Sequence, residues 1–232
     1  MGNYQKFRER FDSAKTDEER KLIILDHVPV IEDKPKETFE FVYGVDSDPW
    51  HYEREWYHQL WSAVYKELAP IITPETTILD LGCGKGHLWR HQDKYLTVKP
   101  KQITGIDISE TAIREGTKWF EDNKIDNMNL FCADLCEEGL NIRGTQDIIL
   151  TISALYYIPA IKRYKLFEKI VDSGSKYIFT IATKWKGDKL YDFPSSYRPN
   201  LWHLKSEFSI RFKEPEPVQR AFYYLGYLYE RK

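Results

Sequence analysis

Short apolar segments alternate with helical segments through the middle of the chain, and this alternation most constrains the fold. Five segments have the length and composition of buried strands, and helical spacing recurs between them. The expected strands are residues 77–81, 103–108, 128–132, 147–152 and 176–182. Strands separated by helices predict right-handed crossovers, and therefore a doubly wound α/β fold with a parallel sheet.

Two further strand-like runs, residues 206–212 and 220–230, follow the parallel part of the chain. Two prolines lie between them, so we expect an antiparallel hairpin that completes a mostly parallel, seven-stranded sheet. Residues 184–205 contain glycine, prolines, serines and several aromatic side chains. We expect them to form a long loop that serves as a substrate lid.

The first 45 residues are expected to form a helical extension ahead of a domain that covers residues 46–232. The sequence Thr16-Asp17-Glu18-Glu19 fits a capping box and precedes four apolar residues, which predicts the start of a short helix. The segment around Pro29 and Pro35 is expected to be a loop. A second helix should cover about residues 48–69, because Asp-Pro is a typical helix start.

The composition limits the classes of function. The chain has 34 basic and 36 acidic residues, and it lacks the positive surplus that general nucleic-acid binding requires. No apolar run approaches the roughly 20 residues that cross a bilayer, so no membrane association is expected. The three cysteines predict neither a disulfide framework nor a metal site, which favours a cytoplasmic protein. The sequence does not indicate an oligomeric state.

Three glycines follow the first expected strand, at positions Gly82, Gly84 and Gly86. Glycine at such a turn permits positive φ and lets a ligand approach the backbone. A Walker-type loop would need Ser or Thr after Gly-Lys, and a dinucleotide loop would need a glycine where His87 stands. Lys85 and His87 are expected to be exposed residues at a helix start. The observed spacing is G-x-G-x-G, with Asp80 two residues ahead.

The segment Asp80-Leu81-Gly82-Cys83-Gly84-Lys85-Gly86 resembles the first motif of Rossmann-like methyltransferases that use S-adenosylmethionine. Three further landmarks of that family follow in order: Gly105-Ile106-Asp107-Ile108-Ser109, Phe131-Cys132-Ala133-Asp134-Leu135, and the strand at 147–152. The resemblance covers roughly residues 75–182. It implies a Rossmann-like fold and S-adenosylmethionine as methyl donor, with S-adenosylhomocysteine as product.

The resemblance also implies which residues hold the cofactor. Asp107, at the end of the second strand, would accept the ribose hydroxyls, and Asp134 would bond the adenine amino group. The strand that contains Thr151 would end beside the methionine moiety. The other expected cofactor contacts come from the same motifs: Asp80, Gly82, Cys83, Gly84, Gly86, Ile108, Ala133 and Leu135.

A second resemblance involves the segment ahead of the first strand. Residues 48–57, which contain Asp-Pro-Trp and Trp-Tyr, are similar to a stretch in nodulation methyltransferases, which methylate an amine on a chitooligosaccharide. It implies that Trp56 and Tyr57 contact the cofactor or line its pocket. An arginine that often follows Trp-Tyr is missing, because Gln59, Leu60 and Trp61 stand there.

The acceptor should lie beyond the carboxyl ends of the strands, near the loop that follows residue 152. That loop lacks the Asn-Pro-Pro-Tyr signature of enzymes that methylate amines in nucleic acids or proteins. Tyr156, Tyr157 and His51 are expected to act as general bases or to orient the acceptor, and His58 and His203 are further candidates.

We therefore expect methyl transfer by in-line displacement to an oxygen or nitrogen atom of a small-molecule or saccharide acceptor. Two alternatives stay open at this point. One is methylation of RNA or protein, and the other is a non-catalytic partner subunit that retains the fold. The glycines and Asp107 favour an enzyme, because a subunit without turnover has no need of a cofactor cradle.

Overall fold

The computed structural model describes residues 2–27, 34–46, 48–50, 52, 55–142, 144, 146–158, 160–184, 201–213 and 221–232. Its α-helices are α1 (Asn3–Ser13), α2 (Asp17–His27), α3 (Pro35–Val45), α4 (Glu55–Leu68), α5 (Gln92–Tyr95), α6 (Glu110–Asp122) and α7 (Ala160–Val171). Short 3-10 helices are η2 (Ala69–Ile71), η3 (His87–His91) and η4 (Leu155–Tyr157). Within these ranges, no helix has both the length and the apolar character that crossing a membrane requires.

One seven-stranded sheet forms the centre of the molecule, in the order β3-β2-β1-β4-β5-β7-β6. The strands are β1 (Thr77–Leu81), β2 (Gln102–Asp107), β3 (Met128–Cys132), β4 (Ile148–Ile152), β5 (Tyr177–Lys184), β6 (Trp202–Lys213) and β7 (Ala221–Arg231). The first five run parallel, while β7 pairs antiparallel with both β5 and β6. The predicted doubly wound sheet with a C-terminal hairpin is confirmed.

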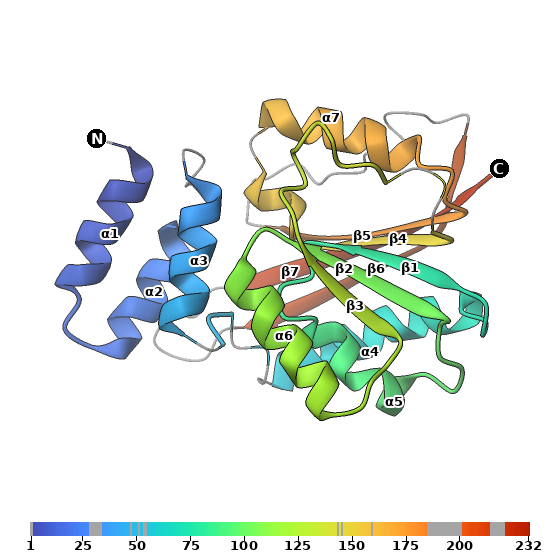
Figure 1. Cartoon of the computed structure of the whole chain (residues 1–232), viewed down its shortest axis with the longest axis horizontal. Coiled ribbons are helices and arrows are strands. Elements are labelled where there is room, and N and C mark those ends of the chain that lie inside the picture. Colours follow the sequence, from blue (N-terminus) through green and yellow to red (C-terminus); the bar gives the residue numbers. More distant parts are fainter. Residues whose placement is uncertain are drawn as a thin grey trace.

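Helices cover both faces of this sheet. Figure 1 shows α7 on one face and α4, α5 and α6 on the other. Strand β4 lies in the middle and is buried almost throughout, as expected for a parallel strand covered on both sides. The strand order changes direction between β1 and β4, and a crevice at the carboxyl ends of the strands forms at such a switch point.

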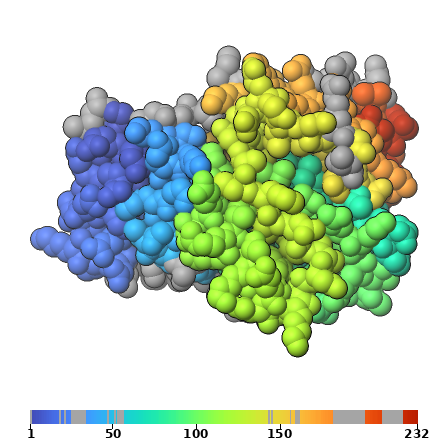
Figure 2. Space-filling model, viewed as in Figure 1, coloured from blue at the N-terminus to red at the C-terminus, as the bar shows by residue number. Residues whose placement is uncertain are grey.

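The N-terminal extension is a bundle of helices packed beside α6, and it forms a separate lobe in the space-filling view (Figure 2). Its core contains Phe7, Phe11, Ile24 and Val42, which pack against one another and reach Ala112 of α6. The predicted helix start is confirmed, since the Glu19 amide donates to Thr16 Oγ1 at 3.1 Å, while the Glu19 carboxylate accepts the Lys15 amide at 2.7 Å. Helices α1 and α3 were not predicted.

Two helix boundaries differ from the prediction. Helix α3 begins at Pro35, where a loop was expected, because proline is well tolerated in the first turn of a helix. Helix α4 begins at Glu55 and not at Asp48. Asp48 does accept a backbone hydrogen bond, from the Tyr52 amide at 2.8 Å, but residues 48–50 form a turn and do not belong to the helix.

The predicted lid is shorter than expected at its C-terminal side. Residues 202–205 belong to β6, and Trp202 is buried in the core beneath α7 together with Tyr229. Trp202 therefore stabilises the sheet and does not belong to a loop over the site. Residues 185–200 lie outside the described residues, so the lid prediction for that segment stays a prediction.

Candidate cofactor and acceptor cleft

The loop after β1 is shaped by glycines in the left-handed region of φ. The backbone φ angles are 77° at Gly82, 54° at Gly84 and 71° at Gly86, and residues that carry a side chain rarely adopt such values. The amides of Gly82 and Cys83 both donate to the Ile106 carbonyl, at 2.7 and 3.1 Å, and this fixes the loop against β2.

Close packing of α6 depends on another glycine, which the sequence analysis missed. A Cβ atom at Gly116 would lie 2.8 Å from the carbonyl oxygen of Lys85. Helix α6 can therefore approach the glycine loop only because Gly116 has no side chain. The loop is held between β2 on one side and α6 on the other.

Asp107 ends β2 with its carboxylate turned back to the loop. Its Oδ2 accepts the Gly84 amide at 2.8 Å, and its Oδ1 accepts the Ser109 amide at 3.0 Å. Burial raises the pKa of this carboxyl, while the backbone donors of Ser109 and Gly84 act in the opposite direction. The predicted helix cap is confirmed, since Ser109 Oγ accepts the Ala112 amide at 3.1 Å.

Asp80 is the second buried carboxyl at this edge of the sheet. Its Oδ2 accepts the indole N–H of Trp89 at 2.8 Å. Burial raises the pKa of Asp80 to about 7, against the lowering effect of the Trp89 hydrogen bond. Neither Asp80 nor Asp107 forms an ion pair with another described residue. Both carboxyls are therefore available to donors supplied by a ligand.

A cleft of about 1260 Å³, measured with its open mouth, lies over the loop and the carboxyl ends of the central strands. Asp107, Ile108, Asp134 and Leu135 line it near β2 and β3. Aromatic residues line it toward β4 and β7, and Asp80, Gly82 and Cys83 lie on its floor. No group of three or more His, Cys, Asp or Glu side chains in the described ranges is arranged to hold a metal.

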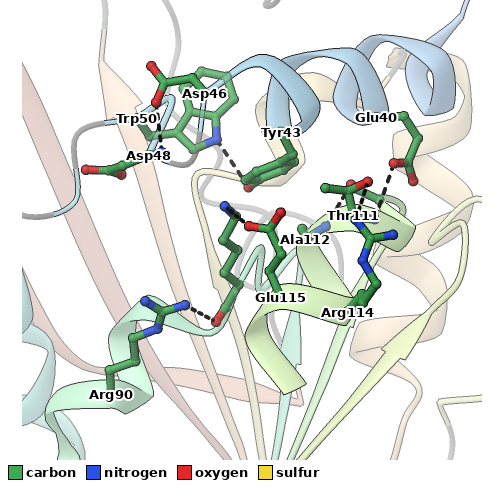
Figure 3. Close-up of polar contacts among 12 residues, drawn as sticks. Glu40, Tyr43, Asp46, Asp48, Trp50, Arg90, Thr111, Ala112, Arg114 and Glu115 are labelled. Carbon is green, nitrogen blue, oxygen red and sulfur yellow. Dashed lines mark hydrogen bonds and ion pairs between the residues drawn. The ribbon is translucent and has the colours of Figure 1, made fainter. Parts of the chain in front are cut away.

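One side of the cleft, which we call its roof, comes from α3 and from the turn that follows it; Figure 3 shows Tyr43 and Trp50 of this part. The Tyr43 hydroxyl accepts the indole N–H of Trp50 at 3.2 Å, and both residues line the cleft. The Glu40 carboxylate accepts the amides of Glu110 and Thr111, and so caps the start of α6. These contacts join the extension to the glycine loop through α6.

Lys85 and His87, which were expected to be exposed, are buried. The Lys85 ammonium lies 2.5 Å from Glu115 Oε2 and 5.5 Å from the centre of the Tyr43 ring. His87 is stacked on Tyr52, with ring centres 4.3 Å apart. The prediction was wrong because Gly86, in the left-handed conformation, leads the chain into a 3-10 turn that faces the core. Burial, and to a smaller extent the positive charge of Arg90, lowers the pKa of His87 to about 2, so its ring is neutral.

Most of the described residues predicted for the site do line the cleft: Tyr57, Asp80, Gly82, Cys83, Asp107, Ile108, Asp134, Leu135 and Tyr157. Four others do not. Gly84 lies beneath Tyr43, Gly86 packs against Phe120, Ala133 packs on the core beneath α7, and Thr151 is buried within β4. These four shape the loop and the sheet behind the cleft.

Three predicted residues fall outside the described part of the chain: His51 altogether, and Trp56 and Tyr156 in their side chains. Among the other candidate bases, His58 lies against His91 and is not among the residues that line the cleft. His203 is exposed on β6, 3.7 Å from Glu230. Five aromatic residues that line the cleft were not predicted; they come from α3, from the segment between α3 and α4, and from β7, and they are Phe39, Tyr43, Trp50, Tyr52 and Tyr224.

Comparison with known proteins identifies the central part of the chain. Residues 78–173 match the model of a family described as a methyltransferase domain. Over these residues the chain is similar to a methyltransferase domain. The matched segment begins in β1 and extends past the end of α7, and it contains the glycine loop, Asp107 and Asp134. A methyltransferase domain of this Rossmann-like class implies S-adenosylmethionine as the methyl donor.

Similar proteins support the same assignment. Over 93 residues, the chain is 30% identical to ribosomal protein L11 methyltransferase of Thermoanaerobacter pseudethanolicus. The match covers 40% of this chain and 28% of that relative, so the chain spans little more than a quarter of its length.

Solved structures show the methyltransferase fold. A protein from Pyrococcus horikoshii superposes with a TM-score of 0.57 at 15% identity, covering 82% of this chain and 98% of that one. The methyltransferase domain of bacterial CtHen1-CN gives a TM-score of 0.54 at 14% identity, covering 74% of this chain and 97% of that one. At such identities the likeness shows the fold alone.

Proposed function

We propose that the chain transfers a methyl group from S-adenosylmethionine to an oxygen or nitrogen atom of a small-molecule or saccharide acceptor. The observation that carries the proposal is the pair of buried carboxyls, Asp107 and Asp80, on either side of the glycine loop. Both line the cleft, and neither has a cationic partner among the described residues.

The donor and acceptor groups around the loop fit S-adenosylmethionine. The Asp107 carboxylate, fixed by two backbone amides, suits a pair of ribose hydroxyls. Asp134 lies farther along the same wall and suits the adenine amino group. Asp80, a buried acid without a cation, suits the ammonium of the methionine moiety. When bound, this cofactor supplies a methyl group already activated on a sulfonium.

Because the methyl group is already activated, the protein has to align the acceptor and exclude water. Phe39, Trp50 and Tyr157 form a set of ring contacts at the roof, with ring centres 5.4 to 6.4 Å apart. Tyr157, the last residue of η4, lines the cleft, and we infer that its hydroxyl orients the acceptor. Tyr156 and His51 stay candidates for the same work.

Several observations favour a small acceptor over a macromolecule. The formal net charge of −2 offers no electrostatic attraction for RNA, and the extension forms a roof over the cleft. A protein acceptor is the second candidate, because the similar Thermoanaerobacter protein carries the name of a ribosomal protein methyltransferase.

The proposal is tested in two steps. Calorimetry should show that S-adenosylhomocysteine binds with one site per chain. A screen with radiolabelled S-adenosylmethionine against phenols, amines, saccharides and ribosomal protein L11 should then label a small molecule and leave the protein unlabelled. Absence of S-adenosylhomocysteine binding would overturn the cofactor assignment. Labelling of the protein alone would favour the second candidate, and binding without transfer to any acceptor would favour a non-catalytic subunit.

A further inference from the structure

Tyr43 brings a hydroxyl group from the N-terminal extension to the glycine loop. The residue belongs to α3, lines the cleft and is only 4% exposed. Its hydroxyl oxygen lies so close to Gly84 that a Cβ atom added there would be 2.7 Å away. The missing side chain of Gly84 therefore lets the hydroxyl reach the loop. The amide of the same glycine donates to Asp107 Oδ2 at 2.8 Å, so the hydroxyl lies near that carboxylate.

The surroundings of the Tyr43 hydroxyl belong to the wall of the cleft. Burial raises the pKa of Tyr43 well above its usual value, and the negative charge of Asp107 is the next cause. Trp50, Cys83 and Tyr157 also act on this pKa, and all of these residues line the cleft. The hydroxyl therefore keeps its proton and lies among residues of the cleft wall.

The Tyr43 hydroxyl has a hydrogen bond left to donate. Its oxygen accepts the indole N–H of Trp50 at 3.2 Å (Figure 3). A tyrosine hydroxyl also donates one hydrogen bond, and no residue in the described part of the chain accepts it. The nearby Asp107 carboxylate instead accepts the amides of Gly84 and Ser109. A ligand atom that accepts a hydrogen bond beside Asp107 would use this donor.

The helix that carries Tyr43 is attached to the segment of chain that follows Asp107. Helix α6 begins at Glu110, shortly after Asp107. The Glu40 carboxylate, on α3, accepts the amides of Glu110 and Thr111 at this helix start (Figure 3). Tyr43 and Asp107 are therefore held in a fixed relationship, which two residues that bind one ligand require.

The chemistry of the ribose fits both residues. Asp107 is the residue proposed to hold the ribose hydroxyls of the cofactor. A hydroxyl group both donates and accepts, so a ribose hydroxyl is able to donate to the Asp107 carboxylate and to accept from Tyr43. The ammonium of the methionine portion has no acceptor atom, which excludes it as the partner of the Tyr43 proton.

We propose that Tyr43 is a cofactor-binding residue whose hydroxyl donates a hydrogen bond to a ribose hydroxyl that Asp107 also holds. Tyr43 lies outside residues 78–173, which match the family model. The N-terminal extension therefore completes the cofactor site, and the matched segment does not form that site alone. This inference rests on the proposed function, because it adds a residue to the site for S-adenosylmethionine.

Two rival roles exist for the Tyr43 hydroxyl. In the first, it donates to the carboxylate of the methionine portion, because the Lys85 ammonium, 5.5 Å from the centre of the Tyr43 ring, attracts anions. Lys85 is already paired with Glu115 at 2.5 Å, and Asp107 repels a carboxylate, so these charges favour the ribose. In the second, the hydroxyl only packs the roof and touches no ligand.

The test compares Tyr43→Phe with the unmodified full chain. Calorimetry measures the affinity of each for S-adenosylhomocysteine and for its 2′-deoxy and 3′-deoxy analogues. Tyr43→Phe keeps the ring and removes the hydroxyl, so its affinity for S-adenosylhomocysteine should be about tenfold lower, the effect of one lost hydrogen bond. With one of the two deoxy analogues the two chains should bind equally, because the ribose hydroxyl that pairs with Tyr43 is already absent. With the other analogue the tenfold difference should persist.

Tyr177→Phe is the matched control. Tyr177 is 8% exposed and its hydroxyl donates to Glu230 Oε1 at 3.0 Å, but it does not line the cleft. Tyr177→Phe should therefore bind all three compounds as the unmodified chain does. Circular dichroism establishes folding. If Tyr43→Phe does not fold, Trp50→Phe decides, because it removes the N–H that orients the Tyr43 hydroxyl and should show a smaller loss with the same dependence on the analogue.

Three results would overturn the inference. One is equal affinity of folded Tyr43→Phe and the unmodified chain for S-adenosylhomocysteine. Another is a loss that persists with both deoxy analogues; 5′-methylthioadenosine, which lacks the amino-acid portion, then separates a carboxylate partner from a packing role. The third is tighter binding by Tyr43→Phe, which would mean that the hydroxyl obstructs the site. Failure of the proposed function looks different, because the unmodified chain would then bind no S-adenosylhomocysteine at all.

Discussion

The Tyr43 hydroxyl lies over Gly84 so closely that a Cβ atom added to the glycine would come within 2.7 Å of the tyrosine oxygen. Tyr43 belongs to α3 of the N-terminal extension, and Gly84 belongs to the loop after β1. The same hydroxyl accepts the Trp50 indole N–H. The extension therefore contacts the glycine loop directly.

This contact predicts a coupling between the two residues. Gly84→Ala should destabilise the chain by about 2 kcal/mol, because φ is 54° and the new methyl group meets the Tyr43 hydroxyl. Tyr43→Phe removes that oxygen. The free energy of unfolding of the double variant should therefore be about 1 kcal/mol higher than the two single effects, added together, would give. Urea unfolding of the unmodified chain, the two single variants and the double variant measures these free energies.

A control for this cycle replaces Gly139, where an added Cβ atom would meet no heavy atom within 4 Å. Gly139→Ala and Tyr43→Phe should be additive. If Gly84→Ala and Tyr43→Phe are additive too, the two residues do not touch in solution and the extension is not docked on the loop.

The parts of the fold that could be predicted depend on local patterns. The strands of the sheet are apolar segments between helices, and the glycine loop and Asp107 are recognisable from spacing alone. The strands, the glycine loop and Asp107 can each be recognised from the residues next to them in the sequence. Gly116 could have been suspected, because a glycine within a helical segment often permits close packing, but its partner lies 31 residues earlier at Lys85.

The parts that were missed depend on contacts between distant segments. The aromatic lining of the cleft comes from residues that precede α4, lie within it, follow the glycine loop and lie on β7. No local pattern relates Tyr52 to Tyr224. The burial of Lys85 depends likewise on Glu115, 30 residues later on α6. A lysine after glycines is ordinarily exposed, and only the packing of α6 makes it an interior residue.

A second prediction concerns Asp107. Asp107→Asn removes the negative charge and replaces one acceptor oxygen with a donor, opposite the amides of Gly84 and Ser109. The affinity for S-adenosylhomocysteine should fall by roughly 10- to 100-fold, the range expected when hydrogen bonds to a charged group are lost. Calorimetry provides the measurement.

Asp122→Asn is the matched control, because Asp122 is an exposed acid paired with Lys118 on the same helix that follows Asp107. It should leave the affinity unchanged. Equal affinity in the unmodified chain and in a folded Asp107→Asn variant would show that the ribose is held elsewhere.

A third prediction follows from the pKa of Asp80, which burial raises to about 7 in the folded chain. An acid with a raised pKa stabilises the fold most at pH below its unfolded pKa of about 3.9, and this contribution is lost as pH rises through 7. Relative to Asp80→Asn, the free energy of unfolding should therefore decline by about 1.4 kcal/mol per pH unit between pH 4 and 7.

Denaturant unfolding of the unmodified chain and of Asp80→Asn across this pH range gives the difference between their free energies of unfolding. The asparagine can still accept the Trp89 indole N–H, so the comparison isolates the ionisation of Asp80. A difference that stays constant from pH 4 to 7 would mean that the pKa of Asp80 is not raised in the folded chain.

The fourth prediction concerns the ion pair beneath the roof of the cleft. The Lys85 side chain is 3% exposed, whereas its partner Glu115 is 42% exposed. Glu115→Gln would remove the carboxylate that pairs with the buried ammonium, and it should destabilise the chain by about 2 kcal/mol. Lys85→Met should cost less, about 1 kcal/mol, because water can solvate the carboxylate that remains. Thermal unfolding should therefore rank the two variants in that order.

The exposed pair of Lys118 and Asp122 supplies the comparison for this ranking. Both of its side chains are more than half exposed, so Lys118→Met should change the free energy of unfolding by less than about 0.5 kcal/mol. If Lys85→Met proves more destabilising than Glu115→Gln, the Lys85 ammonium stabilises the fold through more than its pair with Glu115, because methionine keeps the aliphatic stem and removes only the charge. The contact of that ammonium with the Tyr43 ring would then be the larger contribution to the roof of the cleft.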